Sequence, residues 1–508
     1  MKPDKVLVVD FGGQTTRLIA KTIRALNVYS DIVAHDDIPS ASDDIKAVIL
    51  SGGPKSVTAP DAIRLDPAWF ELGVPVLAIC YGMQAAMQAF GGRVEKDPEG
   101  REFGKATMRI HHKDALFEGL AKEETVWMSH TDSVVALPED FITLATSNRV
   151  LAAVRHQTKP IYGVQFHPEV QHTLNGKRML ENFIRVIAEA KATWKIERIA
   201  DNLVEDIRKA VGKKRVLLGL SGGVDSGVSA VLIDRAIGKN LTCVFVDHGL
   251  LREGEAEDVL KRYRSQYGLN VVFVDAKDRF FDALSGLRDP EAKRKAIGKT
   301  FIDVFTDVAT QQGPFDYLAQ GTLYTDVIES GAGVGATIKS HHNVGGLPEK
   351  LGFDLLEPLR SLFKDEVREL ARALGMRESD LARQPFPGPG LAVRMLGEVT
   401  EEKLAIAKAS DAILRQVFDE TGTVNDVWQF FTVLTDARSV GVMGDERTYG
   451  YVVAVRAVTS SDGMTADWAR VPHAVLERVA STIVNRVEGV SRVVYDITSK
   501  PPGTIEWE

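Results

Sequence analysis

Short apolar runs alternate with amphipathic segments from residue 1 to residue 192 of the chain. The runs are rich in Val, Ile and Leu, which favours buried strands. One longer segment, Met83–Phe90, predicts a helix that ends at Gly91 and Gly92. This alternation is typical of an α/β domain with an open, mostly parallel sheet. The predicted strands are Lys5–Val9, Ala47–Leu50, Val74–Ile79 and Ile161–Phe166.

A second series of the same kind begins at Val216. The segment Thr193–Val211 before it predicts a helix that ends at Gly212. Farther along, the amphipathic segment Phe363–Leu374 predicts another helix, which ends at Gly375. We therefore expect a second α/β domain with a mostly parallel sheet of its own. Its predicted strands are Val216–Leu220, Leu241–Asp247, Val271–Asp275 and Leu318–Ala319.

The segment Gln384–Gly390 interrupts this pattern with three prolines and two glycines. Such a cluster cannot lie inside a helix, so we place a domain boundary there. Beyond it, Tyr451–Val458 and Val490–Ile497 predict strands, and apolar residues at every fourth position from Val475 to Val487 predict a helix. The chain should contain two consecutive open-sheet α/β domains, residues 1–192 and 193–384, and a small α+β domain, residues 385–508.

The composition is that of a soluble globular protein, with 44% apolar and 26% charged residues among 508. A formal net charge of −8 argues against a surface that binds nucleic acid. The sequence shows no signal-peptide pattern and no run near the roughly 20 apolar residues of a membrane helix. Two cysteines are too few for a disulfide framework. We expect a cytoplasmic protein with neither nucleic acid nor membrane as a partner.

The motif S-G-G-V-D-S follows a predicted strand and precedes a helix-like segment. Its two glycines let the backbone N–H groups turn inward, and such a nest at a helix N-terminus favours a polyanion. The two serines add hydroxyl groups, and Asp225 can hold a magnesium ion. A glycine turn with a helix cap is the plainer alternative, which the strand–helix context disfavours. The expected ATP-binding residues of the loop are Ser221, Gly222, Gly223, Val224, Asp225 and Ser226.

Two downstream positions extend this expected ATP site. Val246 opens V-D-H-G at the end of the next predicted strand, where the adenosine would lie. Lys364 begins a predicted helix and can meet a phosphate as a point charge. For Lys364 alone, a solvated lysine is the more common interpretation. Magnesium bound together with ATP is the expected cofactor, with Asp225 as its protein ligand.

A cysteine nucleophile is predicted in the first domain. Cys80 lies at a strand-to-helix turn, A-I-C-Y-G, where Gly82 permits a tight bend and the helix N-terminus favours a thiolate. His167 in F-H-P-E is the candidate base, and Glu169 can orient its imidazole. A buried structural cysteine is the alternative, but the joint placement at strand ends favours a triad that hydrolyses the glutamine amide. The expected oxyanion donors are the backbone N–H groups of Gly53 and Tyr81.

These motifs resemble a known family. C-Y-G-M-Q and F-H-P-E resemble the class I glutamine amidotransferases, and S-G-G-V-D-S resembles the PP-loop ATP pyrophosphatases. Their order, together with V-D-H-G-L-L-R, H-H-N-V-G-G-L-P, P-F-P-G-P-G-L-A-V-R and K-P-P-G-T-I-E-W-E, resembles the glutamine-hydrolysing GMP synthase family. The resemblance spans nearly the whole chain, and the last three motifs are its most specific part.

The resemblance implies a carbon–nitrogen ligase for the final step of de novo guanine nucleotide synthesis. Glutamine would yield ammonia at Cys80. Xanthosine monophosphate (XMP) would attack the α-phosphate of ATP through its 2-oxygen, and ammonia would then displace AMP to give GMP. The last domain would bind XMP and form a homodimer. The residues implied for XMP are Arg394, Lys500, Thr504 and Glu506, with Lys500 suited to phosphate and Glu506 to purine N–H groups.

The chain departs from the family pattern at four positions. Ala78 stands where the family usually has glycine, and Gly227 where it commonly has serine. Thr131 replaces a usual glycine and Thr325 a usual proline. None of these changes removes a chemical group that the reaction needs.

Three other interpretations are compatible with parts of this pattern. A PP-loop enzyme that modifies RNA commonly carries sulfur on cysteines, and Cys243 is the one cysteine outside the first domain. A nucleotide-sensing or scaffold protein would need no intact triad, yet Cys80, His167 and Glu169 are all present. Another glutamine- and ATP-dependent amide-forming synthetase would share both sites, and only the C-terminal motifs count against it.

Overall fold

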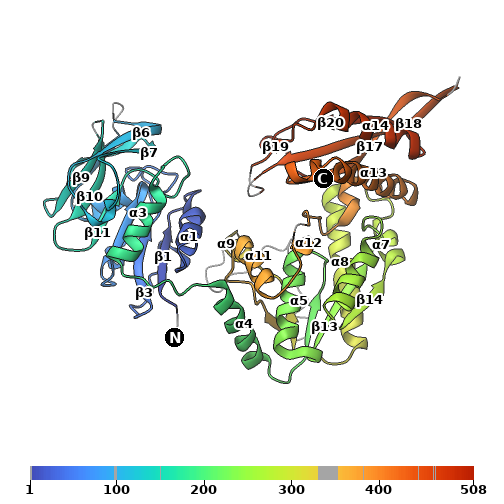
Figure 1. The fold of residues 1–508 in the computed structure, drawn as a ribbon, viewed down its shortest axis with the longest axis horizontal. Coiled ribbons are helices and arrows are strands. Elements are labelled where there is room, and N and C mark those ends of the chain that lie inside the picture. The colour runs from blue at the N-terminus through green and yellow to red at the C-terminus, as the bar shows by residue number, and fades with distance from the viewer. Residues whose placement is uncertain are drawn as a thin grey trace. The chain divides into compact units, whose positions relative to one another are not determined.

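The computed structural model describes residues 3–96, 100–148, 150–329, 353–381, 383–443, 446–460, 463 and 465–508. The motif H-H-N-V-G-G-L-P, residues 341–348, lies outside the described residues. Two compact units divide the chain, one of Met1–Ile199 and one of Ala200–Ser330 with Thr337–Glu508 (Figure 1). The division falls within helix α4 (Ile196–Val211). The proposed division into three domains stays a prediction.

A nine-stranded sheet forms the centre of the first unit, in the order β2-β1-β3-β4-β11-β10-β9-β6-β7. The strands from β2 to β11 run parallel, and those from β11 to β7 pair antiparallel. The predicted strands are confirmed as β1, β3, β4 and β11. The bounds are β1 Lys5–Asp10, β2 Tyr29–Ala34, β3 Ile45–Leu50, β4 Val76–Ile79, β6 Glu102–Ile110, β7 Glu123–His130, β9 Phe141–Ser147, β10 Val150–His156 and β11 Ile161–Val164, with a separate pair β5 Arg93–Lys96 and β8 Asp132–Ala136.

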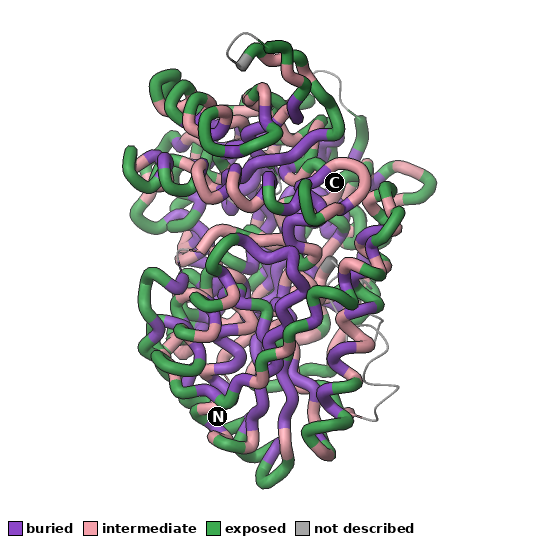
Figure 2. The backbone as a smooth tube through the Cα atoms, turned by 90° about the vertical axis from the view of Figure 1, so that its right-hand side faces the viewer, coloured by how far each residue is buried: buried purple, intermediate pink, exposed green. Residues whose placement is uncertain are grey.

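The central parallel strands β3, β4 and β11 are largely buried on both faces, which is why they are nearly continuous apolar runs (Figure 2). All four residues of β4 are buried, and so are all four of β11. The predicted helix after Cys80 is confirmed as α2. The helices of this unit are α1 Thr16–Arg24, α2 Tyr81–Ala89 and α3 Gly176–Asn182, followed by the π-helical turn η3 Phe183–Ile187, with short 3-10 turns η1 Pro67–Phe70 and η2 Ala115–Phe117.

The second unit contains a fully parallel five-stranded sheet in the order β14-β13-β12-β15-β16. Its strands are β12 Val216–Gly219, β13 Leu241–Asp247, β14 Val271–Asp275, β15 Tyr317–Ala319 and β16 Asp354–Leu356. The four strands predicted for this region are therefore confirmed, as is the helix after Phe363. The helices are α5 Val224–Ile237, α6 Glu255–Leu260 with the π-helical turn η5 Lys261–Gln266, α7 Lys277–Leu284, α8 Pro290–Gln311, α9 Tyr324–Glu329, α11 Lys364–Ala373 and α12 Glu378–Leu381, with the 3-10 turn η4 Gly238–Asn240.

The C-terminal part of this unit is a smaller α+β arrangement, as predicted. Strand β18 pairs antiparallel with β17 and β19 and parallel with β20. Helix α13 packs against β17, and α14 packs against β20 and α13. One apolar core continues from α8 through the 3-10 turn η6 to the strands of this part. The bounds are η6 Gly390–Arg394, α13 Glu401–Glu420, η7 Thr423–Asp426, β17 Gln429–Met443, β18 Glu446–Thr459, β19 Asp467–Trp468, α14 His473–Arg486 and β20 Val490–Asp496.

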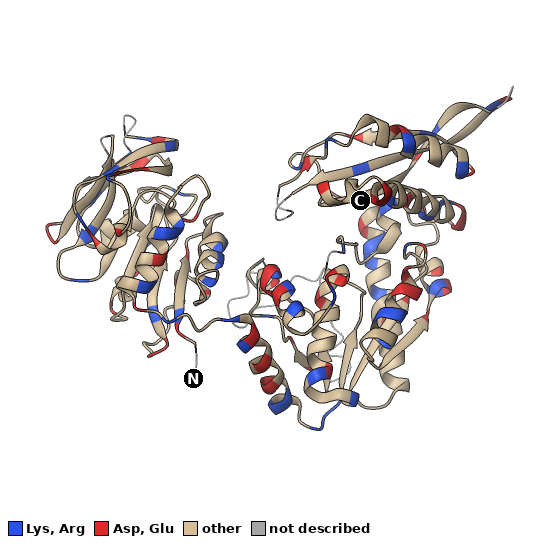
Figure 3. Cartoon of the chain, viewed as in Figure 1, with Lys and Arg blue, Asp and Glu red and all other residues tan. Residues whose placement is uncertain are grey.

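Charged residues of both signs are interspersed on the surface helices (Figure 3). This mixture fits the modest net charge of −8. In the part of the chain that the structure describes, no helix combines the length and the apolar character needed to cross a bilayer.

The departure at Gly227 has a steric explanation in this fold. Gly227 lies in α5, and a Cβ atom built there would lie 2.1 Å from the hydroxyl oxygen of Tyr263. Tyr263 is buried in η5, with only 2% of its surface exposed. Its ring therefore fills the space that a serine side chain would need.

Gly227→Ser should lower the free energy of unfolding by about 1–3 kcal/mol, the usual cost of overpacking a core. Tyr263→Phe in the same chain should recover part of this loss, because it removes the atom that lies nearest. Urea denaturation followed by fluorescence measures both effects. Gly298→Ser in α8 is the matched control, since a Cβ atom there meets nothing within 4 Å. Equal losses in Gly227→Ser and Gly298→Ser would contradict the steric explanation.

Candidate active sites

Cys80 occupies the junction between β4 and α2 in a strained conformation. Its φ of 51° and ψ of −108° are rare for a residue with a side chain, and such strain is concentrated at functional sites. Gly82 lies one residue inside the helix, and a Cβ atom there would come within 2.6 Å of the Leu50 carbonyl oxygen. Glycine is therefore required for α2 to pack closely against β3, which places Cys80 at the edge of the sheet.

The predicted triad is brought together. His167 Nδ1 lies 2.7 Å from Glu169 Oε1, and both residues are buried. Burial alone would lower the pKa of His167, but interactions with the Cys80 thiol and the Glu169 carboxylate outweigh burial and raise this pKa to about 10. His167 is therefore an imidazolium at neutral pH, beside the sulfur that has to carry the negative charge.

The residues predicted as oxyanion donors also lie beside the triad. A Cβ atom built on Gly53 would lie 3.0 Å from Cγ of Tyr81, so the two residues are neighbours. Among the described residues, neither backbone N–H group donates a hydrogen bond. A Cβ atom on Gly52 would lie 3.1 Å from His167 Cε1 and 3.8 Å from Cys80 Cβ, so only glycine leaves room for a substrate there.

Two buried amides next to the nucleophile were missed by the sequence reasoning. Gln165 Nε2 lies 3.7 Å from Cys80 Sγ, and Gln84 Nε2 donates to Gln165 Oε1 at 3.2 Å. Gln84 also donates to the backbone oxygen of Asp132 at 2.8 Å, so the start of β8 is tied to the site. Gln84 is the last residue of the motif C-Y-G-M-Q, and Gln165 directly precedes F-H-P-E. These positions were the only sequence signal that the two side chains lie near the nucleophile.

Two of the departures lie around this site without disrupting it. Ala78 is fully buried in β4, where it pairs in register with Gly163 of β11. Thr131 is exposed between β7 and β8, and its hydroxyl donates to Asp132 Oδ1 at 3.3 Å. The remaining departure, Thr325, lies in α9 of the second unit. Nothing in the structure explains why threonine replaces proline there.

The predicted phosphate loop lies between β12 and α5. Gly222 has a φ of +77°, and Gly223 is the N-cap residue of α5. The loop is closed by its own serines, because Ser221 Oγ and Ser226 Oγ lie 2.9 Å apart and the Gly223 N–H donates to Ser221 Oγ at 3.3 Å. Val246 lies near the same edge of the sheet, at the end of the adjacent strand β13. This arrangement can accept a polyanion.

Asp225 and Lys364, predicted for magnesium and phosphate, lie in contact. Lys364 Nζ, at the start of α11, lies 2.5 Å from each carboxylate oxygen of Asp225. Among the described residues, no group of three or more His, Cys, Asp or Glu side chains could hold a metal by itself. One carboxylate fits magnesium that arrives with ATP, since this ion commonly takes one or two carboxylates, phosphate oxygens and water.

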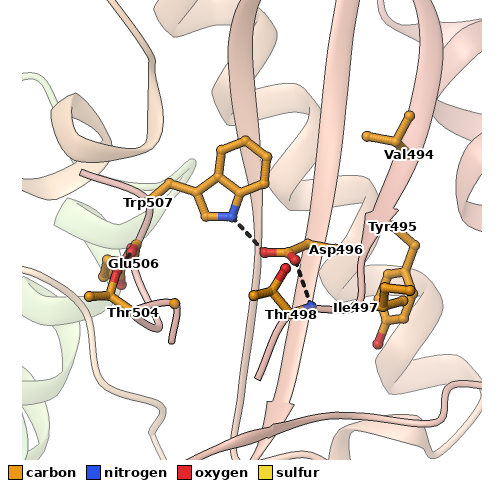
Figure 4. A pocket seen from close by; sticks show the side chains of 9 residues that line it. Val494, Tyr495, Asp496, Ile497, Thr498, Thr504, Glu506 and Trp507 are labelled. Atoms are coloured by element: carbon orange, nitrogen blue, oxygen red, sulfur yellow. Dashed lines mark hydrogen bonds between the residues drawn. The ribbon is translucent and has the colours of Figure 1, made fainter. Parts of the chain in front are cut away.

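The four residues implied for XMP lie in the C-terminal part, where two of them pair with each other. Arg394 is fully buried, and its Nε and Nη2 donate to the two carboxylate oxygens of Glu506 at 3.1 and 2.8 Å. Thr504 donates to the backbone oxygen of Glu506. Thr504 and Glu506 line an open pocket (Figure 4). Lys500 does not line this pocket, and its ammonium donates to the Gly463 carbonyl oxygen at 2.8 Å.

Two buried cations that hold the C-terminal segment were not predicted. Arg456 donates to the backbone oxygens of Thr504 and Ile505 at 3.1 and 3.4 Å. Lys293 in α8 donates to the backbone oxygen of Met395 at 2.9 Å and to the carboxylate of Glu508. Both cations have 0% exposure. A charged residue in a helical or strand pattern is normally expected at the surface, so the sequence held no signal for them.

Three family models match the chain. Glutamine amidotransferase class-I covers residues 7–187, NAD synthase residues 195–291 and the GMP synthase C terminal domain residues 416–507. GMP synthase (glutamine-hydrolyzing) of Geobacillus kaustophilus is 55% identical over 513 residues, covering 100% of both chains. Proteins of the same name from Bacillus cereus and Exiguobacterium sibiricum are 53% and 52% identical over 99% of each chain. The chain belongs to the glutamine-hydrolysing GMP synthase family.

Membership in the GMP synthase family matches the order of the sites along the chain. The amidotransferase match contains Cys80 and His167, and the NAD synthase match contains the loop Ser221–Ser226. The match to the GMP synthase C terminal domain contains Lys500 and Glu506. The resemblance noted in the sequence is thus confirmed over the full length of the chain.

The pH dependence of glutamine hydrolysis tests the electrostatics of the triad. The raised pKa keeps His167 protonated up to about pH 10, so activity that needs the imidazolium should fall only as the pH rises through that value. Glu169→Gln removes a carboxylate that raises this pKa and should move the alkaline limb down by about 1 pH unit or more. Glutamate release measured from pH 6 to pH 11 checks this.

Glu181→Gln is the control for this experiment, because Glu181 is exposed and pairs only loosely with Arg178 at 3.5 Å. Its profile should match that of the parent chain. An alkaline limb at the same pH in Glu169→Gln and the parent would contradict the assigned role of Glu169.

Proposed function

We propose that this chain converts XMP to GMP, with glutamine as the source of nitrogen and ATP as the activating nucleotide. The observation that carries the proposal is one chain with an intact triad at Cys80, an intact phosphate loop at Ser221–Ser226 and 55% identity over its full length to a GMP synthase (glutamine-hydrolyzing). Each site supplies one half of the reaction.

At the first site, the Cys80 thiolate attacks the side-chain amide carbon of glutamine. The N–H groups of Gly53 and Tyr81 donate to the oxygen that becomes negative. His167 gives its proton to the nitrogen, the carbon–nitrogen bond breaks and ammonia leaves. Water then attacks the thioester, releases glutamate and restores the thiol. Glu169 holds the imidazole in the orientation that these proton transfers need.

At the second site, the 2-oxygen of XMP attacks the α-phosphate of ATP and pyrophosphate leaves. Ammonia attacks carbon 2 of the adenylated purine, and AMP leaves with the former 2-oxygen. The loop N–H groups and Lys364 bind the phosphates, and Val246 lies where the adenosine is expected. Magnesium held by Asp225 and the phosphate oxygens would neutralise the charge on the departing pyrophosphate.

The acceptor is assigned to the C-terminal part. The Glu506 carboxylate can accept hydrogen bonds from purine N–H groups, and its bidentate pair with the buried Arg394 fixes its direction. Lys500 is assigned to the phosphate of XMP because its ammonium is a point charge bound only to a carbonyl oxygen among the described residues. Thr504 is assigned to the same site through its contact with Glu506.

A homodimer through residues 385–508 and a cytoplasmic location are part of the proposal. Val440, Val442 and Tyr449 on the β17–β18 hairpin are 48%, 72% and 65% exposed, which supports a role of this hairpin in burying apolar surface against a second copy.

The structure disfavours the interpretation as an RNA-thiolating enzyme. Cys243 is 0% exposed, and burial raises its pKa to about 12. A sulfur carrier needs an accessible thiolate, so Cys243 is a poor candidate. The alternative interpretation, another glutamine- and ATP-dependent amide-forming synthetase, differs from the proposed function only in the acceptor.

One assay tests the proposed function against that rival. The chain is incubated with ATP, magnesium and glutamine, and with either XMP or other acceptors that carry an oxo or carboxyl group. We expect the chain to release AMP, pyrophosphate and GMP in equal amounts when XMP is the acceptor, and to release none of them with the other acceptors. Release of AMP with a different acceptor, and a product of corresponding mass, would overturn the assignment to GMP synthesis.

Cys80→Ala should abolish GMP synthesis from glutamine and leave synthesis from added ammonium salts within about twofold of the parent, since only the first site loses its nucleophile. GMP formation with each nitrogen source measures this. Cys243→Ala is the control and should retain both activities, because Cys243 takes no part in either site. Loss of the ammonium-dependent reaction in Cys80→Ala would show that Cys80 has another role.

Lys500→Ala should raise the KM for XMP by about tenfold or more, corresponding to ~1.4 kcal/mol, with a smaller effect on kcat. Steady-state kinetics with ammonium as the nitrogen source measure this without the first site. Lys209→Ala, at an exposed pair with Glu205 on α4, is the control. A KM for XMP within about twofold of the parent, under ~0.4 kcal/mol, would exclude Lys500 from phosphate binding.

A further inference from the structure

Arg383 lies outside the sequence motifs and connects the phosphate loop to α6. Its Nη1 donates to the backbone oxygen of Gly222 at 2.8 Å, and its Nη2 donates to Glu255 Oε1 at 2.8 Å. The second oxygen of Glu255 accepts from the backbone N–H of Arg252 at 3.1 Å. Glu255 has 8% exposure at its side chain and Arg383 has 21%, so the bridge is largely shielded from water.

The carbonyl that Arg383 holds belongs to the same planar peptide unit as the Gly223 N–H of the loop. The Gly222 C=O and the Gly223 N–H form one trans peptide, so they point in opposite directions. With the carbonyl held toward Arg383, the Gly223 N–H points to Ser221 Oγ, 3.3 Å away inside the loop. The loop is where the phosphates of ATP are expected.

Two adjacent glycines make this peptide easy to rotate. Gly222 has a φ of +77°, and glycine populates both signs of φ at little cost. Val259 of α6 packs against Gly222, since a Cβ atom built on Gly222 would lie 2.9 Å from Val259 Cγ2. A residue with a side chain would not fit there. The orientation of the peptide itself is fixed by the hydrogen bond to Arg383. Without this bond, the peptide would be held at one end only, by the hydrogen bond from the Gly223 N–H to Ser221 Oγ.

We infer that Arg383 is a positioning residue that fixes the Gly222–Gly223 peptide so that the Gly223 N–H faces the phosphates of ATP. Arg383 acts through the peptide, with one N–H of Nη1 donated to Gly222 and one N–H of Nη2 donated to Glu255. This inference rests on the proposed ATP site. The bridge uses the planar fork of a guanidinium, because Nη1 donates to Gly222 and Nη2 to Glu255, whereas an ammonium offers a single nitrogen.

Arg383→Lys separates geometry from charge, because it keeps the positive charge and loses the fork. Calorimetric binding of MgATP to the full chain is the first readout. We expect Arg383→Lys and Arg383→Met to weaken binding by about tenfold or more. Glu255→Gln should weaken it less, and adding it to Arg383→Lys should cause little further loss, because both changes break the same bridge.

Kinetics with ammonium and XMP provide the second readout. We expect the KM for ATP to rise by about tenfold in Arg383→Lys while the KM for XMP stays within about twofold, a separation that a general loss of structure would not produce. Arg372→Ala, at an exposed pair with Glu378, is the control and should match the parent in both readouts. If Arg383→Met does not fold, the results with Arg383→Lys and Glu255→Gln test whether Arg383 positions the Gly222–Gly223 peptide.

MgATP affinity in Arg383→Lys equal to that of the parent would overturn the inference, since charge alone would then suffice and Arg383 would act as a direct phosphate ligand or not at all. A parallel rise in the KM values for ATP and XMP would also overturn it. The binding readout needs no XMP. A parent chain that binds MgATP but makes no GMP would therefore count against the proposed function and leave the inference about Arg383 standing.

Discussion

Both candidate sites depend on helices whose first turns have no side-chain cap. The N-cap residues are Cys80 for α2 and Gly223 for α5, and neither provides a capping hydrogen bond from its side chain. The N–H groups of a helix's first turn need partners, and a ligand can supply them. At Cys80 these groups favour a thiolate and an oxyanion, and at Gly223 they favour phosphate. The same structural device thus supports both halves of the proposed reaction.

The acceptor region depends on a different interaction, the burial of cations beneath the C-terminal segment. Arg394, Arg456 and Lys293 are fully buried, and each has a carboxylate partner, namely Glu506, Asp496 or Glu508. Removing one partner of a buried ion pair lowers the stability of the fold by more than the intact pair contributes to it, because the remaining charge stays buried without a partner. The segment that carries Thr504 and Glu506 is therefore held in one conformation. These contacts would keep Thr504 and Glu506 in place for the proposed acceptor site.

The sequence predicted the features that depend on neighbours along the chain. The strand end at Ile79, the turn at Cys80 and the glycines of the phosphate loop are all local patterns. Arg383 could not be predicted, because its acceptor Gly222 lies 161 residues away. Lys293 and its partner Glu508 are separated by 215 residues, and Tyr263 fills the space at Gly227 without any local signal. Tertiary contacts of this kind are set by packing, which periodicity does not encode.

The central claim is that nitrogen released by the Cys80 thiolate replaces an oxygen that leaves with AMP. Glutamine labelled with ¹⁵N in its amide and XMP labelled with ¹⁸O at position 2 test both halves at once, by mass spectrometry of the products. We expect GMP to contain ¹⁵N and to lack the ¹⁸O, and AMP to contain the ¹⁸O in its phosphate. Recovery of ¹⁸O in water or pyrophosphate, or GMP without ¹⁵N, would contradict this chemistry.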